Sequence, residues 1–375
     1  MIFKKNIFQI RFVISIVFWK IIILLHKIIF KKNRFKVIFI SEKKEWAITN
    51  VAKNIVNKIT KKKPEYIILS NRPQRFENKI IHFGSHYMWL LWSEYLSKNN
   101  KYIVSFYHGN PMLNESEKKI FYSFIRTVPK LEKIVVSNSI IKNRLLQHGV
   151  LENKIVQIPI GVNTKTFVPP STKQRKSARK KFNFLDTDIV IGSFQKDGVG
   201  WKKGIEPKLI KGPDIFVKVL DKLNKDFEIK VLLTGPARGF VINKLKKLEI
   251  PFYHSFLSNY HDILEYYYAL DFYLITSRDE GGPMGLMESM SIGIPVISTK
   301  VGMSEDLIKN KETGLIIDSF EPNIIAKNFK KYINSLKKPQ NKSEFSRKLV
   351  KVADWKNVSN KHLKLYESII QSQTK

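Results

Sequence analysis

The stretch TSRDEGGPMGLMESMSIGIPVIST, residues 276–299, decides the fold of the second half of the chain. It continues an apolar run, DFYLIT, that has the pattern of a buried strand. Pro283 suits the first position of a helix, Gly293 suits the position after its last turn, and Pro295 prevents continuation. The stretch therefore predicts a strand, a polar turn, a helix over about 283–292 and a second buried strand, which together make a βαβ unit.

The turn before this helix has the composition of an anion-binding site. A helix N-terminus offers unpaired N–H groups and about half a positive charge, and glycine lets an anion approach the backbone closely. Glu280 precedes the turn, and Glu288 lies five residues inside the helix, roughly 7.5 Å along its axis at about 1.5 Å per residue. A carboxylate there can accept hydrogen bonds from the ribose of a bound nucleotide. We therefore expect a diphosphate to bind at Gly281, Gly282, Pro283, Met284 and Gly285.

Each glutamate also has an ordinary structural interpretation. Glu280 would then cap the helix, and Glu288 would be a solvated residue on its surface. Two carboxylates on either side of a Gly-Gly-Pro turn favour the ligand interpretation over this one.

The composition is that of a globular protein with a strong basic excess. The 375 residues suffice for two domains, and 43% are hydrophobic. The absence of cysteine excludes disulfides, thiolate metal sites and cysteine nucleophiles. The net charge of +34 suits an anionic membrane, phosphorylated substrates or nucleic acid, and it also fits a general bias toward lysine. We expect no nucleic-acid partner, because the lysines are scattered and form no concentrated stripe.

Short apolar runs alternate with amphipathic stretches of helical length, and this predicts parallel sheets in an α/β fold. Five runs precede a Pro/Gly-rich linker over 158–172, and six follow it: KVIFIS, EYIILS, KIIHFG, YIVSFYHG and KIVVSNS, then DIVIGSF, IKVLLTG, IPFYHSF, DFYLITS, IPVIST and GLIIDS. We expect two Rossmann-like, doubly wound domains facing a cleft. The predicted parts are a membrane-associating segment at 1–33, an N-terminal acceptor domain at 34–165, a C-terminal nucleotide-sugar domain at 166–342, and a C-terminal helix at 343–375 that packs back toward the N-terminal domain.

The first 33 residues are apolar and basic. A spanning helix needs about 20 apolar residues, but Arg11 and Lys20 would be costly at mid-bilayer. A basic helix lying in the membrane interface fits better, and an ordinary buried helix is the remaining interpretation. We expect a cytoplasmic protein that associates peripherally with the inner face of the cell membrane.

The spacing Glu-x7-Glu in EGGPMGLMESMSIGIPVIST resembles the signature of family 4 retaining glycosyltransferases, which have the GT-B fold. Further segments resemble the family's interdomain passage, the start of its Lys-Gly helix, the region after the second glutamate and its C-terminal helix. These segments are KIVQIPIGVNTKTFVP, PKLIKGPDIFVKVL, VGMSEDLIKNKETGLIID and DWKNVSNKHLKLY. Together they cover roughly residues 100–370.

The resemblance implies a role for each matching residue. Glu288 would bind the nucleotide ribose, Glu280 the donor sugar, and Lys211 the diphosphate. His108, in FYHGN, matches a histidine near the reacting sugar, so His108 and Glu280 are the expected catalytic residues.

Two departures from the family pattern concern the second domain and the N-terminal domain. The usual arginine after the first strand of the second domain is missing: either Lys196 in GSFQKDG takes its place at the diphosphate or the site is built differently. Arg238 in LTGPARG is either a second diphosphate ligand or a solvated residue on a loop at a strand end. The glycine-rich loop after the first N-terminal strand is replaced by SEKKEWAIT, which contains no glycine. We expect no metal or other cofactor, because the Asp-Thr-Asp at 186–188 precedes a strand, whereas a metal-binding Asp-x-Asp would follow one.

The predicted function is transfer of a sugar, with retention of configuration, from a nucleotide-diphosphate sugar to a hydroxyl acceptor. The expected partners are that donor, a lipid-linked or cell-envelope glycan acceptor, and the membrane surface. The alternatives are another GT-B enzyme such as a nucleotide-sugar epimerase, a non-catalytic sugar-nucleotide-binding subunit, and a basic nucleic-acid-binding protein.

Overall fold

The computed structural model of the protein describes residues 35–42, 47–309, 311–336 and 343–372. The chain divides into two compact units. Unit 1 contains the N-terminal part up to Val136, then Lys142–Ile158, and the chain from Trp355 onward. Unit 2 contains Ser137–Ile141 and Pro159–Asp354.

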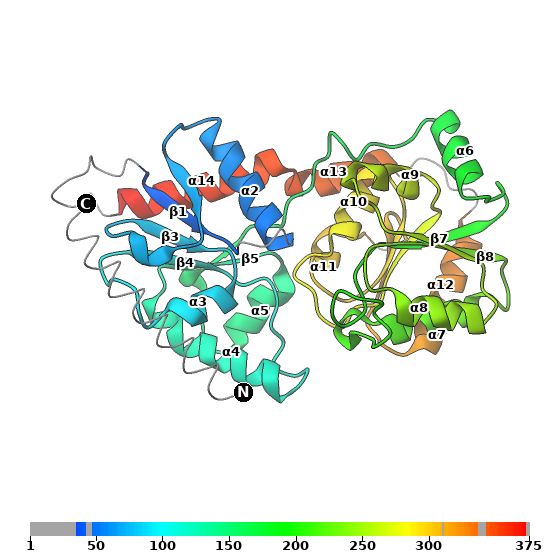
Figure 1. The fold of residues 1–375 in the computed structure, drawn as a ribbon, viewed down its shortest axis with the longest axis horizontal. Coiled ribbons are helices and arrows are strands. Elements are labelled where there is room, and N and C mark those ends of the chain that lie inside the picture. The colour runs from blue at the N-terminus through cyan, green and yellow to red at the C-terminus, as the bar shows by residue number, and fades with distance from the viewer. Residues whose placement is uncertain (1–34, 43–46, 310, 337–342, 373–375) are drawn as a thin grey trace. The chain divides into compact units, whose positions relative to one another are not determined.

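Unit 1 is built on a six-stranded, all-parallel sheet with the strand order β2-β1-β3-β4-β5-β6 (Figure 1). Its central strands are buried on both faces, which is why their sequences are nearly continuous apolar runs. The strands are β1 Val37–Ile40, β2 Ile67–Ser70, β3 Ile80–Phe83, β4 Lys101–Ser105, β5 Lys133–Val136 and β6 Ile155–Gln157. The helices are α2 Ala47–Thr60, α3 His86–Trp92, α4 Glu115–Thr127, α5 Ser139–Gln147 and α14 Trp355–Gln371, of which α14 packs along α2.

Unit 2 repeats this plan with a second parallel sheet, in the order β12-β11-β10-β7-β8-β9. Its strands are β7 Ile189–Ser193, β8 Ile229–Thr234, β9 Phe252–Ser255, β10 Phe272–Ile275, β11 Val296–Thr299 and β12 Gly314–Ile317. The helices are α6 Thr172–Lys181, α7 Pro213–Leu223, α8 Gly239–Lys247, α9 Ile263–Tyr268, α10 Met284–Ile292, α11 Ser304–Leu307, α12 Pro322–Ser335 and α13 Ser343–Val350. Its core forms where Phe216 and Leu220 of α7 and Phe329 of α12 meet apolar residues of β7, β8, β10 and β11.

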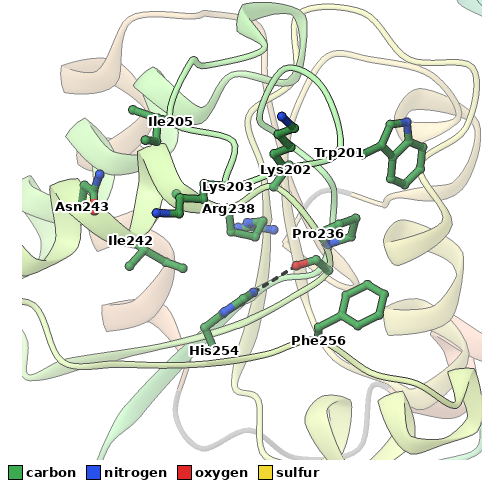
Figure 2. Close-up of a pocket in the computed structure, with 13 residues that line it drawn as sticks. Trp201, Lys202, Lys203, Ile205, Pro236, Arg238, Ile242, Asn243, His254 and Phe256 are labelled. Atoms are coloured by element: carbon green, nitrogen blue, oxygen red, sulfur yellow. Dashed lines mark hydrogen bonds between the residues drawn. The ribbon is translucent and has the colours of Figure 1, made fainter.

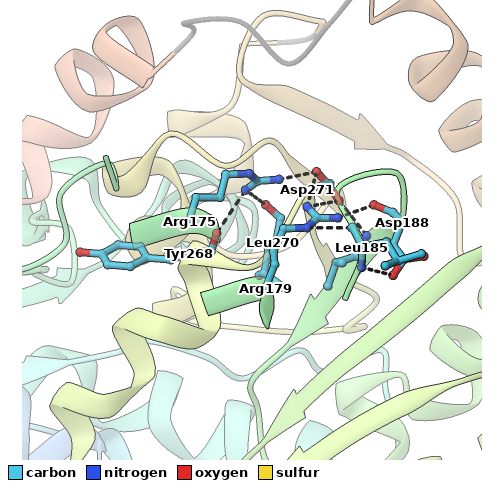
Figure 3. Close-up of polar contacts among 8 residues, drawn as sticks. Arg175, Arg179, Leu185, Asp188, Tyr268, Leu270 and Asp271 are labelled. Atoms are coloured by element: carbon cyan, nitrogen blue, oxygen red, sulfur yellow. Dashed lines mark hydrogen bonds and ion pairs between the residues drawn. The ribbon is translucent and has the colours of Figure 1, made fainter. Parts of the chain in front are cut away.

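A partly buried charge network joins α6 to the start of β10 (Figure 3). Arg175 and Arg179, one helical turn apart on α6, both bind the Asp271 carboxylate, at 2.7 and 3.2 Å. Asp188 accepts a 2.8 Å hydrogen bond from the Leu185 N–H and so closes the turn before β7. The Asp-Thr-Asp sequence therefore contributes to a structural turn.

The predicted α/β fold with two Rossmann-like units is confirmed, and every predicted strand is present. The sequence missed β6, since three residues are too few to show a period. The tail predicted over 343–375 is two helices, and they belong to different units. The first, α13, packs on α10 in unit 2, and the chain enters unit 1 only at Trp355.

The membrane-associating segment predicted at 1–33 lies outside the described residues. Among the helices that the structure describes, none is both long and apolar enough to cross a membrane.

Candidate active site

The quoted stretch forms the turn and helix predicted for it, with a shift at the start. Helix α10 begins at Met284, and Pro283 is its N-cap in extended conformation rather than its first residue. Gly293 ends the helix in the left-handed conformation, with φ of 92°, which a residue with a side chain rarely adopts. In the described structure, no side chain caps the N-terminus of α10.

Glu280 is held by a lysine and a serine. The Lys211 Nζ lies 2.5 Å from Glu280 Oε1, and the Ser277 hydroxyl donates to the same oxygen at 3.0 Å. Glu280 is 9% exposed and does not cap the helix. The capping interpretation is therefore wrong, and Glu280 pairs with Lys211 four residues before the first residue of α10.

Backbone packing places Lys211 at this point. Lys211 ends a short 3-10 helix, Leu209–Lys211, and Gly212 follows it with φ of 64°. A Cβ at Gly212 would lie 1.8 Å from the Thr276 carbonyl oxygen, so only glycine fits. The Thr276 hydroxyl also donates to the Gly212 carbonyl at 2.8 Å. This close approach joins the start of α7 to the end of β10 and brings Lys211 to Glu280.

Glu288 is not a surface residue of the helix. Its side chain is 2% exposed, and Tyr267 donates to its Oε2 at 2.6 Å while Tyr260 donates to its Oε1. Burial raises the pKa of Glu288, and the two phenol hydrogen bonds oppose that rise. The carboxylate is therefore a buried acceptor already paired with two hydroxyl groups.

Gly285, in the first turn of α10, allows close packing inside unit 2. A Cβ there would lie 2.2 Å from the Tyr273 hydroxyl oxygen, so any larger residue would push α10 away from β10. Gly285 therefore allows the N-terminus of α10 to pack closely against β10, and this packing role is separate from any contact with a ligand.

The loop after β7 carries Lys196 and Gln195. Lys196 Nζ lies 4.2 Å from the centre of the Trp201 ring, a cation–π contact. The Gln195 side chain donates to the Lys211 carbonyl at 3.1 Å and so links this loop to the predicted diphosphate lysine. Lys196 is thus engaged with an aromatic side chain.

Arg238 is buried instead of facing solvent. Its side chain is 0% exposed, lies 3.3 Å from the Asp197 carboxylate, and donates to the carbonyls of Ser193 and Gln195. Burial lowers the pKa of Arg238 and raises that of Asp197, and their attraction opposes both shifts. The geometry assigns Arg238 to holding the loop after β7 in place, and Arg238 is also one of the residues that line the cavity described next.

A cavity of about 780 Å³ lies between this loop and the ends of β8 and β9 (Figure 2). The exposed rings of Trp201 and Phe256 line it together with His254 and Arg238. Lys211, Glu280 and Glu288 do not line it. The sequence offered one signal for this cavity, a tryptophan within the glycine- and lysine-rich GVGWKKG.

His108 belongs to unit 1, so it is described apart from the residues above. It follows β4 by three residues and is half-buried, with the rings of His86 and Tyr87 each 5.5 Å away. Burial, and then the nearby His108, hold the pKa of His86 well below its usual value. His86, which sequence reasoning missed, is therefore a neutral neighbour of His108.

No group of three or more metal-ligating side chains occurs within the part of the chain that the structure describes.

Known proteins resemble this chain in sequence and in fold. Residues 205–349 match the family described as Glycosyl transferases group 1. An uncharacterised glycosyltransferase of Methanocaldococcus jannaschii, MJ1178, is 25% identical over 274 residues, covering 70% of this chain and 67% of that protein. The lipopolysaccharide core biosynthesis mannosyltransferase LpsB of Rhizobium meliloti is 29% identical over 167 residues, covering 42% of this chain and 44% of its own length.

The fold matches that of Anabaena HepE, solved in complex with UDP and glucose. The TM-score is 0.69 at 12% identity, and the match covers 88% of this chain and 99% of HepE. Residues 205–349 include Lys211, Glu280 and Glu288, so these three residues of the candidate site fall inside the matched family segment, whereas Lys196 and His108 lie outside it. The chain is a glycosyltransferase with the GT-B fold, and its residues 205–349 are similar to the Glycosyl transferases group 1 family.

Proposed function

We propose that this enzyme transfers a sugar from a nucleotide-diphosphate sugar to a hydroxyl acceptor with retention of the anomeric configuration. The bond between the sugar C1 and the diphosphate oxygen breaks, and a bond forms between C1 and the acceptor oxygen. The diphosphate leaves with the bonding electron pair, and the acceptor's proton passes to it. The HepE structure, which holds UDP and glucose on this fold, supports a nucleotide-linked donor.

One observation carries the proposal: Lys211 Nζ lies 2.5 Å from Glu280 Oε1 beside the N-terminus of α10. A cation and a helix N-terminus together neutralise a departing diphosphate, and the carboxylate is placed to contact the sugar attached to it. Glu288, farther along the same helix, binds the nucleotide ribose. The resemblance to family 4 enzymes supports these roles and a contact of His108 with the reacting sugar.

The other proposed diphosphate contacts are the backbone of Gly281, Gly282, Met284 and Gly285, and Lys196. Lys196 would exchange its Trp201 contact for the diphosphate. Arg238 would contribute indirectly, by holding the carbonyls of Ser193 and Gln195. These cations do the work that a divalent metal does in other transferases, so the reaction is proposed to need none.

The acceptor is proposed to be a lipid-linked or cell-envelope glycan. LpsB acts in lipopolysaccharide core biosynthesis, and the apolar, basic residues 1–33 suit a membrane interface. Full-length protein is expected to sediment with anionic vesicles, whereas a chain beginning at residue 34 should not. Equal sedimentation of the two would contradict the membrane role of this segment.

The test of the site uses Glu288→Gln and Glu280→Gln, each titrated calorimetrically with nucleoside diphosphates. Glu288→Gln should weaken binding of the nucleoside diphosphate by about 1.5–3 kcal/mol, because charge-assisted hydrogen bonds to the ribose are lost. Glu280→Gln should leave that affinity nearly unchanged while turnover falls steeply, because its partner is the sugar. Wild-type affinity in both folded variants would contradict the ribose role of Glu288.

A further inference from the structure

Both oxygens of the Glu288 carboxylate are occupied by hydroxyl groups of the protein itself. Tyr267, on α9, donates to Oε2 at 2.6 Å. Tyr260, in the short 3-10 helix Tyr260–Asp262, donates to Oε1. A ribose presents the same kind of donor, an O–H group, to the same acceptor.

The two tyrosines differ in their freedom to move. Tyr267 is fully buried and packs against the rings of Phe194, Tyr273 and Phe167, at centroid distances of 4.8, 5.8 and 5.9 Å. Its hydroxyl can leave Glu288 only if this cluster opens. Tyr260 is 55% exposed, and the ring of Phe167 lies 6.3 Å from its own. Tyr260 can therefore turn into solvent at little cost in packing.

We propose that the Tyr260 hydroxyl occupies the ribose position on Glu288 in the unliganded protein and that the donor's ribose displaces it. Tyr267 remains on Oε2 as a positioning residue that holds the carboxylate in one orientation. The inference rests on the proposed role of Glu288. It adds a cost to donor binding, because the ribose must replace an existing hydrogen bond to a buried carboxylate.

The exchange of one hydroxyl for another also has a benefit for the unliganded enzyme. A buried carboxylate with an unfilled acceptor position is destabilised by desolvation. Tyr260 fills that position until a ligand with suitably placed hydroxyls arrives. The site therefore favours ribonucleotides over ligands that cannot replace the phenol hydroxyl.

The test compares Tyr260→Phe with the matched variant Tyr267→Phe in the full chain. Each removes one hydroxyl from Glu288 and keeps the aromatic ring, so any stacking on a nucleobase is retained. Tyr260→Phe should bind uridine or guanosine diphosphate about tenfold more tightly than wild type by calorimetry, since no competitor has to leave. Tyr267→Phe should bind it more weakly, because the carboxylate loses its fixed orientation.

A second binding experiment tests the ribose hydroxyls directly. The affinity gain of Tyr260→Phe should vanish with the 2′,3′-dideoxy form of the same nucleoside diphosphate, because that ligand leaves Tyr260 in place. Equal or weaker diphosphate binding by folded Tyr260→Phe overturns the inference, as does the same gain with the dideoxy ligand. Absence of nucleoside diphosphate binding in wild type and in both variants overturns the proposed function as well.

Discussion

Lys211 Nζ and Glu280 Oε1 lie 2.5 Å apart, joined across 69 residues of sequence by the contact between Gly212 and Thr276. Among the described residues the lysine has one carboxylate partner, and its side chain is 25% exposed. Lys211 is therefore a cation that is already positioned beside Glu280 and partly accessible to solvent.

Lys211→Met should weaken nucleoside diphosphate binding by at least about tenfold, because the removed cation would neutralise the diphosphate. Arg278→Met is the matched control, since Arg278 makes a comparable, part-exposed ion pair with Asp214 on α7. Calorimetric titration compares the two. Equal affinities in these two variants would contradict the assignment of Lys211.

Removing one partner of the buried Arg238–Asp197 pair should destabilise unit 2. Both side chains are at most 1% exposed, so Arg238→Met leaves Asp197 as an unpaired buried charge, at a cost of about 3–5 kcal/mol. Urea unfolding measures this difference. Unchanged stability with weaker diphosphate binding would instead make Arg238 a direct ligand of the donor.

Acid should destabilise unit 1 through its buried histidines. Burial lowers the pKa of His362 to about 3 and holds that of His82 well below its ordinary value. The unfolded chain therefore binds more protons than the folded one below about pH 6.5, and stability falls as the pH drops from there toward 3.

His362 alone should contribute about 1.4 kcal/mol of lost stability per pH unit near pH 5. Its ring nitrogens have no hydrogen-bond partner within the described structure. His362→Phe should then unfold in urea with a shallower pH dependence than wild type. The same slope in both proteins would show that His362 does not drive the acid sensitivity.

Transfer activity should survive chelation by EDTA, because in the proposed mechanism Lys211 and the N-terminus of α10 neutralise the diphosphate in place of a metal. The measurement is sugar transfer from a panel of nucleotide sugars, with and without chelator. A complete loss that added divalent metal restores would show that these groups are insufficient.

Much of the fold could be predicted because it depends on local pattern. Strands such as β1 and β10 are apolar runs buried on both faces, and Gly293 ends α10 through its own left-handed backbone. The spacing of Glu280 and Glu288 on either side of a Gly-Gly-Pro turn could likewise be read from one short stretch of sequence. Local signals fail where the partner is distant: nothing near residue 343 shows that α13 packs on α10.

The amino-acid sequence by itself determined most strands and helices along the chain, the C-terminal end of α10 at Gly293 and the placement of Glu280 and Glu288 around one helix start, because backbone preference and apolar period act over a few residues. Only the tertiary structure decided the environment of each charge. Arg238 became a buried partner of Asp197, and Glu288 became an acceptor for Tyr260 and Tyr267. Burial and electrostatic pairing depend on groups that the fold brings together from distant positions in the sequence. These groups decide whether a charged side chain contacts solvent, another residue or a ligand.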